Sequence, residues 1–343
     1  MLPRVAAIFL FLAVQPEATA WAGPALLFDA ADGKILYAED QDDQWHPASL
    51  TKIMTAYVVF EALKEGKFDL ATKIVSSSNA SSQPPTRVGM AAGARMTVDK
   101  ALQALIIQSA NDVAVMLAEA VAGSHEAFVE RMNATATRLG MSRTKFVNAN
   151  GLPEAGQVTT ARDLAKLARA VLKDYPEHTR LWSLLDVHIG KRHFGTFNGL
   201  LANYAGADGM KTGFTCDSGF NVVASATREG RKLIAVVLGE NTGSSRSLRA
   251  SSFLEHGFQS FAWKALFPSE SVDTLPIADD AKGPITIRRT VVSWVCGTAR
   301  RAVAKLTKKR AVAEGEGGEA PAKRGSFRKT KALTKPQMQW QPW

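Results

Sequence analysis

The chain has 343 residues with a formal net charge of +10, and 46% of its residues are hydrophobic and 22% charged, a composition typical of a globular protein. From residue 282 onward, 15 lysines and arginines stand against three glutamates, so this segment carries +12 and the preceding 281 residues carry −2. This distribution argues against a basic nucleic-acid-binding face on the body. It predicts instead that the C-terminal segment binds an anionic membrane surface or an acidic polymer.

Residues 1–22 have the features of a secretory signal peptide in the required order. Arg4 gives a positive start, Val5–Val14 is an apolar run of ten residues, and small-residue cleavage sites end at Ala20 and Ala22. The run is too short for a membrane span, and no later segment is apolar over the about 20 residues that a span needs. We therefore expect export across the cytoplasmic membrane to the periplasm, with peripheral membrane attachment through the basic C-terminal segment.

The body carries strand patterns at its two ends and helix patterns between them. Apolar runs on either side of Asp29–Gly33 predict a first β-hairpin, and residues 219–239 predict a second one. Residues 76–95 are expected to be mostly loop, and apolar residues at helical spacing predict helices over 49–64, 97–120 with a polar break at 109–111, 125–139, 160–173 and 245–263. This order predicts one α+β domain over residues 23–263, an antiparallel sheet flanked by helices with an inserted helical subdomain.

Three further segments are expected beyond this domain. Residues 264–289 form a short connector, in which 271–287 could hold one short strand pair. Apolar and basic residues at helical spacing predict a basic amphipathic helix over 290–310, and the Gly-, Glu-, Lys- and Pro-rich residues 311–343 are expected to form a disordered basic tail. The basic helix is the expected contact with an anionic membrane surface.

Ser49 and Lys52 form the first candidate catalytic pair. The S-x-x-K pattern is weak by itself, since it occurs twice more, starting at Ser142 and Ser326. Ser49, however, follows a proline and opens an apolar, and therefore buried, helix. Residues three apart share a helix face, and burial lowers the pKa of a lysine, so a neutral amine could take the proton of the neighbouring hydroxyl. The alternative is that Ser49 only caps the helix.

Two more groups of polar residues stand out. Ser109 and Asn111 lie between two apolar helical segments, where they either belong to a polar site or cap the helix ends. Lys211-Thr212-Gly213 occurs once, on a predicted strand beside the 219–239 hairpin. Its lysine and threonine offer a cation and a hydroxyl to an anionic group, and its glycine lets a substrate backbone lie close. Neighbouring backbone N–H groups can form part of an oxyanion hole.

Together and in this order, these motifs resemble the signature set of penicillin-recognising serine enzymes. The chain most resembles the low-molecular-mass penicillin-binding proteins that act as serine-type D-alanyl-D-alanine carboxypeptidases, over about residues 24–263. The likeness includes the segments 47–52, 108–112, 150–152, 160–164, 208–215 and 219–221. It implies the β-lactamase/transpeptidase-like fold. Only 80 residues follow residue 263, so the separate C-terminal β-sandwich of many family members is expected to be absent or truncated.

The resemblance also implies catalytic roles. Ser49 would attack the peptide bond between the last two D-alanines of a peptidoglycan stem peptide, with Lys52 as its base. Ser109 would relay a proton to the leaving amine, and Asn111 would hold the acyl amide of the substrate. β-Lactam antibiotics, which mimic D-Ala-D-Ala, should acylate the same serine.

Substrate binding would fall to the strand around residue 212 and to one arginine. Lys211 and Thr212 would bind the terminal carboxylate, assisted by Arg246, which matches a family arginine. Gly213 and Phe214 continue the substrate-binding strand. The backbone N–H groups of Phe214 and the nucleophilic serine would form the oxyanion hole.

Three alternatives stay open. A D,D-endopeptidase of the same fold would act on cross-linked peptidoglycan and would differ only in the shape of its subsites. A β-lactamase needs a carboxylate that activates water, and the nearest candidate, Glu154, lies in a segment unlike the β-lactamase loop. A non-catalytic wall- or membrane-binding protein is disfavoured because every catalytic position is filled.

No metal or other cofactor is expected. His188 and His193 are five residues apart in a segment that we expect to be a polar loop, and the H-E-x-x-H pattern that begins at His125 lacks its second histidine. Cys216 and Cys296 lie in different segments, so a disulfide between them is not expected.

Overall fold

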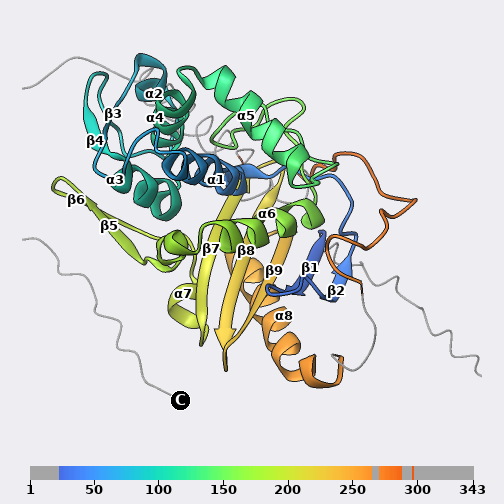
Figure 1. Cartoon of the computed structure of the whole chain (residues 1–343). Coiled ribbons are helices and arrows are strands. Elements are labelled where there is room, and N and C mark those ends of the chain that lie inside the picture. Colours follow the sequence, from blue (N-terminus) through green and yellow to red (C-terminus); the bar gives the residue numbers. More distant parts are fainter. Residues whose placement is uncertain (1–22, 265–269, 288–295, 297–343) are drawn as a thin grey trace, which may run out of the picture. The chain divides into compact units, whose positions relative to one another are not determined.

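The computed structural model describes residues 23–264, 270–287 and Cys296 (Figure 1). The predicted signal peptide (1–22), the predicted basic helix (290–310, apart from Cys296) and the predicted disordered tail (311–343) lie outside these residues. Among the described residues, no helix combines the length and the apolar character that crossing a membrane requires.

Five strands form one antiparallel sheet in the order β2-β1-β9-β8-β7. β1 (Ala25–Asp29) and β2 (Ile35–Glu39) form the predicted first hairpin, and β8 (Gly219–Arg228) and β9 (Arg231–Glu240) form the second. β7 (Ala207–Thr215) is the edge strand beside β8 and carries Lys211-Thr212-Gly213. Because β1 pairs with β9, strands from the two ends of the domain lie side by side, which confirms the predicted α+β architecture.

Helices and short elements fill the chain between β2 and β7, and α8 (Gly243–Lys264) follows β9. In chain order they are η1 (Ala48–Leu50), α1 (Thr51–Lys64), β3 (Lys73–Val75), α2 (Ser78–Ser82), β4 (Arg95–Thr97), α3 (Val98–Gln103), η2 (Ala104–Gln108), α4 (Asn111–Ala122), α5 (His125–Arg138), α6 (Ala161–Asp174), η3 (Pro176–Ser183), β5 (Asp186–Ile189), β6 (Arg192–Gly195) and α7 (Leu200–Asn203). The predicted helices are all present. Three of them, α3, α5 and α6, are preceded by the capping residues Thr97, Ser124 and Thr160, whose side chains accept hydrogen bonds from backbone N–H groups three residues later.

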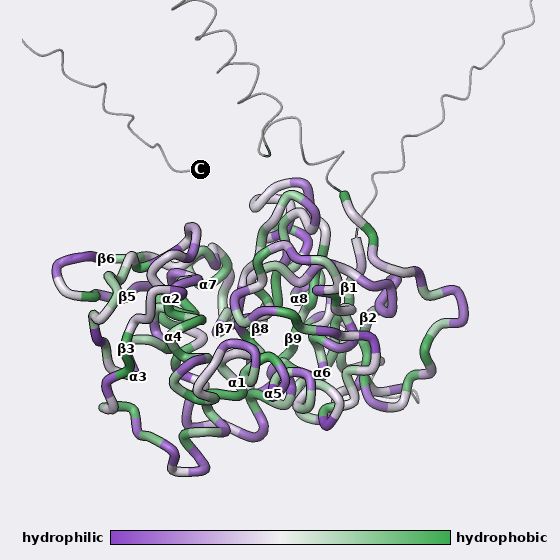
Figure 2. Tube along the Cα trace, turned by 90° about the horizontal axis from the view of Figure 1, so that it is seen from above, coloured by the Kyte–Doolittle hydropathy of each residue, from purple (hydrophilic) through white to green (hydrophobic). Residues whose placement is uncertain are grey.

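The sheet separates two hydrophobic cores. On β9, the even-numbered residues from Ile234 to Leu238 lie in one core and the odd-numbered residues from Leu233 to Val237 in the other, as the alternation of a strand requires. α6 packs against one face of the sheet, and α8 packs against the opposite face (Figure 1). Figure 2 shows the hydrophobic tube concentrated along β9 and α4, inside the body.

α1 lies among α4, α5 and α6 rather than on the surface. Every residue from Thr51 to Phe60 is buried, including Lys52. The apolar sequence therefore predicts the burial of this helix correctly. Only the tertiary structure shows which groups surround the buried amine.

The predicted strand pair over 271–287 is wrong. Among residues 270–287, only Ser271 forms a β-bridge, and its partner is Lys34 in the body. Apart from local turns, the segment makes backbone bonds to the body: Ile285 N–H donates to Gln44 O, and Arg162 donates to the carbonyl oxygens of Leu275 and Pro276. Paired with Asp42 in a buried ion pair, Arg162 links α6 to this segment. The body thus supplies the hydrogen bonds that a strand pair would have supplied.

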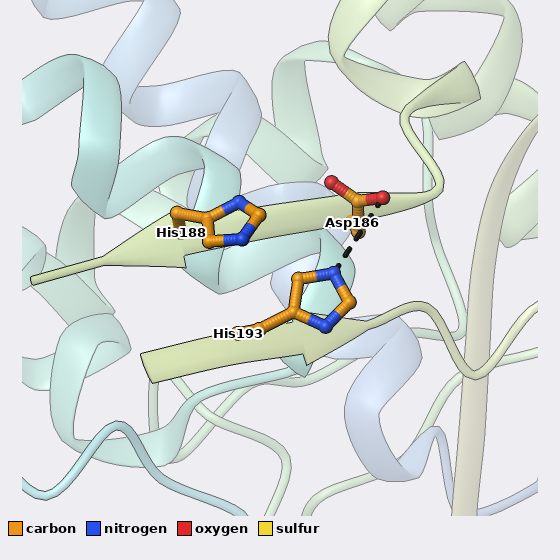
Figure 3. A group of neighbouring side chains, drawn as sticks. All are labelled: Asp186, His188 and His193. Carbon is orange, nitrogen blue, oxygen red and sulfur yellow. Dashed lines mark ion pairs between the residues drawn. The ribbon is translucent and has the colours of Figure 1, made fainter. Parts of the chain in front are cut away.

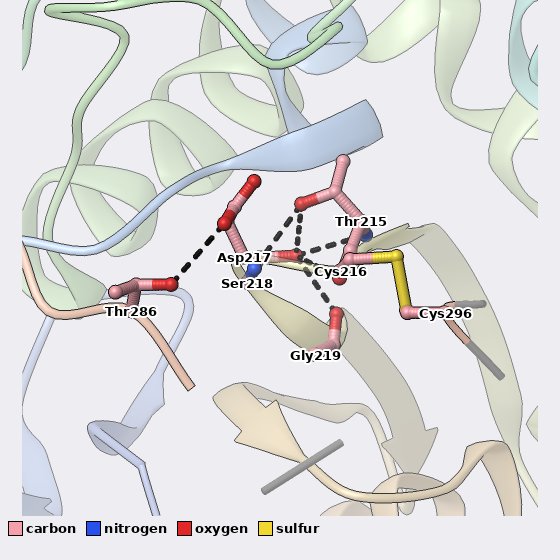
Figure 4. The surroundings of a disulfide bond; sticks show 7 residues. All are labelled: Thr215, Cys216, Asp217, Ser218, Gly219, Thr286 and Cys296. Carbon is pink, nitrogen blue, oxygen red and sulfur yellow. Dashed lines mark hydrogen bonds between the residues drawn. A yellow bond between two sulfur atoms is a disulfide. The ribbon is translucent and has the colours of Figure 1, made fainter. Parts of the chain in front are cut away.

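The expectation that Cys216 and Cys296 do not pair is also wrong, because they form a disulfide (Figure 4). Ile287 N–H donates to Asp217 O, and Thr286 Oγ1 donates to Asp217 Oδ1 at 3.3 Å. The C-terminal segment therefore lies beside residue 217 at Ile287, and the Cα atoms of Cys216 and Cys296 are 5.7 Å apart. The large separation of the two cysteines along the sequence did not predict this contact.

His188 and His193 lie on paired strands rather than in a polar loop. They face each other across the β5–β6 hairpin. The inner face of the hairpin buries Val187 and Phe194, and this apolar pair is what holds the short strands on the body.

Candidate active site

The segment just before Ser49 is held against β8 and the residue preceding that strand. Asn221 on β8 donates from Nδ2 to the carbonyl oxygens of His46 and Pro47, at 3.1 and 3.4 Å, and its Oδ1 accepts from Gly239 N–H at 2.9 Å. The indole N–H of Trp45 donates to Ser218 O at 2.9 Å. The Gly219-Phe220-Asn221 motif thus holds the backbone that presents Ser49.

Ser49 does not act as a helix cap. It lies inside η1, and neither η1 nor α1 has a side-chain cap. Its Oγ lies 3.0 Å from Lys52 Nζ. The alternative that Ser49 only caps the helix is therefore not supported.

Lys52 has three uncharged hydrogen-bond partners. Besides Ser49 Oγ, its Nζ contacts Asn111 Oδ1 at 2.8 Å and Asn150 O at 2.5 Å. The amide of Asn111 is oriented by its Nδ2, which donates to Pro84 O at 3.0 Å. Two acceptors and one hydroxyl suit a neutral amine, which has two N–H groups and one lone pair.

The surroundings of Lys52 favour its neutral form. Burial lowers its pKa well below the ordinary lysine value, and the positive charge of Lys211 lowers it further, while Asp112 opposes these effects. Lys52 is fully buried, and its hydrogen-bond partners in the described part of the chain include no carboxylate. The site therefore holds a potential base one helical turn from a hydroxyl.

Ser109 occupies a strained position at the end of η2. Its φ of 57° and ψ of 37° lie in the left-handed region, which a residue other than glycine adopts at a cost. Its Oγ is buried and has no hydrogen-bond partner among the described residues. Neither Ser109 nor Asn111 caps a helix with its side chain, so the simple capping alternative is not supported for this motif either.

Asp112 anchors the loop next to this serine motif. Its carboxylate accepts from the backbone N–H groups of Val88, Gly89 and Met90 at 3.0, 2.7 and 3.2 Å. Thr86 Oγ1 in the same loop donates to Ser109 O at 2.9 Å. The loop over residues 84–90 thus forms one wall of the site and is fixed by these buried and partly buried hydrogen bonds.

β7 forms the opposite wall and runs close to the nucleophile. A Cβ at Gly213 would lie 3.1 Å from both Pro47 O and Ser49 N. The sequence suggested that this glycine makes room for a substrate backbone. In the structure, the close neighbour that requires a glycine is the chain's own segment around Ser49.

Two buried cations lie on the β7 side. Burial lowers the pKa of Lys211 to about 7, and the charge of Arg246 contributes to the shift. Burial also lowers the pKa of Arg246 to about 10. Arg246 Nε has no hydrogen-bond partner among the described residues, and its guanidinium donates to Phe197 O at 3.3 Å. Two buried cations without a carboxylate contact in the described part of the chain form an environment suited to an incoming anion.

These groups surround a cavity of about 430 Å³. Seven of the nine predicted site residues line it, namely Ser49, Ser109, Asn111, Thr212, Gly213, Phe214 and Arg246, while Lys52 and Lys211 are buried behind its wall. Sequence reasoning missed Pro85, Thr86 and Phe197, which also line the cavity. All three belong to irregular segments. The one sequence feature that could have indicated a role in the cavity was the aromatic residue Phe197 in an otherwise polar stretch. Phe197 is 48% exposed.

Residues 12–242 match the sequence model of the family described as D-alanyl-D-alanine carboxypeptidase, Peptidase S11. The chain belongs to this family. The match covers the serine–lysine pair, the Ser109 motif and the Lys211 strand. It confirms the resemblance that the motifs indicated.

Curated and structural relatives agree. The chain is 38% identical over 252 residues to D-alanyl-D-alanine carboxypeptidase DacC of Escherichia coli, a match that covers 71% of this chain and 62% of that protein. The crystal structure of penicillin-binding protein 5 from Haemophilus influenzae has 34% identity and a TM-score of 0.67, covering 69% of this chain and 71% of that one. Penicillin-binding protein D2 from Listeria monocytogenes, solved in its ampicillin-bound form, has 31% identity and a TM-score of 0.61, covering 69% of this chain and 97% of that one.

These neighbours confirm the β-lactamase/transpeptidase-like fold. The chain spans about three fifths of the length of the first curated relatives it matches, 64% and 62% respectively.

Proposed function

We propose that the protein is a serine D-alanyl-D-alanine carboxypeptidase that removes the terminal D-alanine from peptidoglycan stem pentapeptides through an acyl-enzyme intermediate. The observation that carries the proposal is the contact of Ser49 Oγ, in the cavity wall, with the buried amine of Lys52, next to a cavity that Arg246 lines and Lys211 backs.

Acylation begins at Ser49. Lys52, as a neutral amine, takes the hydroxyl proton while Oγ attacks the carbonyl carbon of the penultimate D-alanine. Asn111 Oδ1 and Asn150 O keep the amine aimed at the hydroxyl. The backbone N–H groups of Ser49 and Phe214 stabilise the oxyanion that forms.

The terminal carboxylate of the substrate binds on the β7 side. Thr212 donates its hydroxyl, and Lys211 and Arg246 supply positive charge. An incoming carboxylate raises the pKa of Lys211 from about 7, because it adds a negative neighbour. Arg246 Nε, which has no hydrogen-bond partner among the described residues, gains an acceptor in the same step.

Collapse of the tetrahedral intermediate breaks the C–N bond and leaves an ester on Ser49. The leaving D-alanine amine receives a proton through Ser109, whose Oγ is buried without a hydrogen-bond partner among the described residues. A water molecule then attacks the ester, Lys52 again takes a proton, and the serine hydroxyl is restored. A β-lactam would form the same ester without losing a leaving group, since its ring nitrogen stays attached.

Release of D-alanine from a pentapeptide by the purified protein tests the proposal. The expected result is stoichiometric release that Ser49→Ala abolishes together with covalent labelling by fluorescent penicillin. Cleavage of a cross-linked dimer in preference to the pentapeptide would favour the D,D-endopeptidase alternative. Penicillin labelling that persists in Ser49→Ala would overturn the assignment of the nucleophile, and a wild-type protein without labelling or cleavage would support the non-catalytic alternative.

We further propose export to the periplasm, with the basic segment 290–310 binding the anionic membrane surface. The signal-peptide features and the charge of +12 after residue 281 support this. Since each basic residue near an anionic surface adds about 1 kcal/mol, Arg300→Gln/Arg301→Gln/Lys305→Gln should weaken binding to anionic vesicles while D-alanine release persists. These substitutions keep Cys296 and its disulfide. Vesicle binding that equals that of the unsubstituted protein would exclude the basic segment as the membrane contact.

A further inference from the structure

The β5–β6 hairpin presents three metal-ligating side chains on one face. Its register pairs His188 with His193 and Asp186 with Gly195, so the two imidazoles lie directly across from each other and the carboxylate lies two pairs away, on the same face (Figure 3). The opposite face buries Val187 and Phe194 against the body. The outer face is therefore held in place by the packing of the inner one.

The three groups converge. His193 Nε2 lies 3.6 Å from Asp186 Oδ2, and the two imidazole rings lie 4.6 Å apart at their centroids. One ligand atom from each of the three residues lies within 4.8 Å of the others. Figure 3 shows both rings and the carboxylate on the same side of the hairpin.

We propose that Asp186, His188 and His193 bind a divalent transition-metal ion, Zn²⁺ being the one that this donor set suits best. Two imidazole nitrogens and one carboxylate oxygen are ordinary zinc ligands at about 2.0–2.2 Å, with water in the remaining tetrahedral position. Ligand atoms around such an ion lie about 3.3 Å apart, so the widest separation must shrink by at most about 1.5 Å. Exposed side chains reach this geometry by rotation about their own bonds, without movement of the paired strands.

The site is separate from the catalytic cavity, since none of its three residues lines that cavity. It is nevertheless connected to one of the cavity walls. The hairpin contacts η2, which ends at Ser109, and Arg192 between the two histidines in sequence donates to Val88 O. Val88 N–H in turn donates to Asp112. A bound ion would crosslink the outer face of the hairpin and stabilise its attachment to this wall, without taking part in the hydrolysis.

Calorimetric titration of the purified protein with ZnCl₂ tests the inference. We expect saturable binding of one equivalent, absent in a parallel titration with MgCl₂, because Mg²⁺ prefers oxygen ligands. Substitution of a residue that only contacts a metal ligand typically lowers the metal affinity about 10- to 100-fold. Substitution of a ligand itself should do at least as much, so His188→Ala and His193→Ala should each weaken Zn²⁺ binding at least about tenfold. Asp186→Asn should weaken it less than either.

His256→Ala serves as the matched control, because His256 is an exposed histidine on α8, away from the hairpin. The His256→Ala variant should bind Zn²⁺ with the same affinity as the wild type. Zn²⁺ should also raise the melting temperature of the wild type and of His256→Ala, but not that of the double variant His188→Ala/His193→Ala. Penicillin labelling of Ser49 should persist in EDTA.

Two outcomes would overturn the inference. One is the absence of saturable Zn²⁺ binding by the wild type, which would leave the Asp186–His193 contact as a simple ion pair. The other is a double variant that binds Zn²⁺ as tightly as the wild type, which would place the ion elsewhere. The melting temperatures without added metal show whether each variant is folded, so a binding loss is read only from folded protein.

Discussion

Removal of the Cys216–Cys296 disulfide should destabilise the body strongly while leaving its chemistry intact. The crosslink closes a loop with a sequence separation of 80 residues. In the chain-entropy description, closing a loop of that length removes about 15 cal/mol/K from the unfolded chain, or about 4.5 kcal/mol of unfolding free energy at 25 °C. Cys216→Ser/Cys296→Ser should lose up to this amount.

The effect is expected to act on the unfolded state because the native contacts of the C-terminal segment do not need the crosslink. Ile285 N–H still donates to Gln44 O, and Arg162 still pairs with Asp42 and donates to Pro276 O. If the native chain near residue 287 becomes more mobile once the crosslink is absent, the native state gains entropy. The loss of unfolding free energy is then smaller. The value of about 4.5 kcal/mol is thus an upper value.

Urea unfolding of the double variant and of the wild type, both monitored by circular dichroism, measures the difference. At about 2–4 °C per kcal/mol for a domain of this size, the melting temperature should fall by about 9–18 °C at the upper value. The rate of penicillin labelling should be unchanged, although Thr215 next to Cys216 lines the cavity. A stability loss under about 1 kcal/mol would refute the reasoning, as would a labelling rate as low as that of Ser49→Ala.

Further predictions concern the catalytic groups and their surroundings. Lys52→Arg keeps the charge but cannot act as base, so D-alanine release should fall by more than tenfold, a loss above about 1.4 kcal/mol; a smaller loss would make the role of Lys52 electrostatic. Because burial lowers the pKa of Lys211 to about 7, the unfolded chain binds more protons than the folded one between about pH 7 and 10. The unfolding free energy should therefore rise with pH in that window, and Lys211→Met should remove up to about 1.4 kcal/mol per pH unit of that slope; equal slopes in pH-dependent urea melts would contradict it. A Cβ at Gly151, where φ is +81°, would lie 1.9 Å from Ala48 O. Gly151→Ala should therefore displace the backbone next to the nucleophile and slow penicillin labelling, and labelling at the wild-type rate would argue against this close approach.

The sequence alone determined the features that depend on local periodicity. Strand alternation and turn residues predicted the two hairpins of the sheet, and apolar spacing predicted α1 and its burial. The three-residue spacing of Ser49 and Lys52 put both side chains on one helical face, and the structure places Oγ and Nζ 3.0 Å apart. Such relations involve only neighbouring residues, so the geometry of a single helix or strand is sufficient to predict them.

The tertiary structure decided what depends on contacts between distant segments. The acceptors that orient the Lys52 amine come from Asn111 and Asn150, which are 59 and 98 residues away. The disulfide joins cysteines 80 residues apart, and residues 270–287 of the chain between them bond to the body. The cluster of two imidazoles and one carboxylate on the β5–β6 hairpin follows from strand register, which ligand spacing along the chain does not reveal. Local patterns give the direction of a side chain within its own element, but they do not say which other elements pack around it; that depends on how the hydrophobic faces of all elements are buried together.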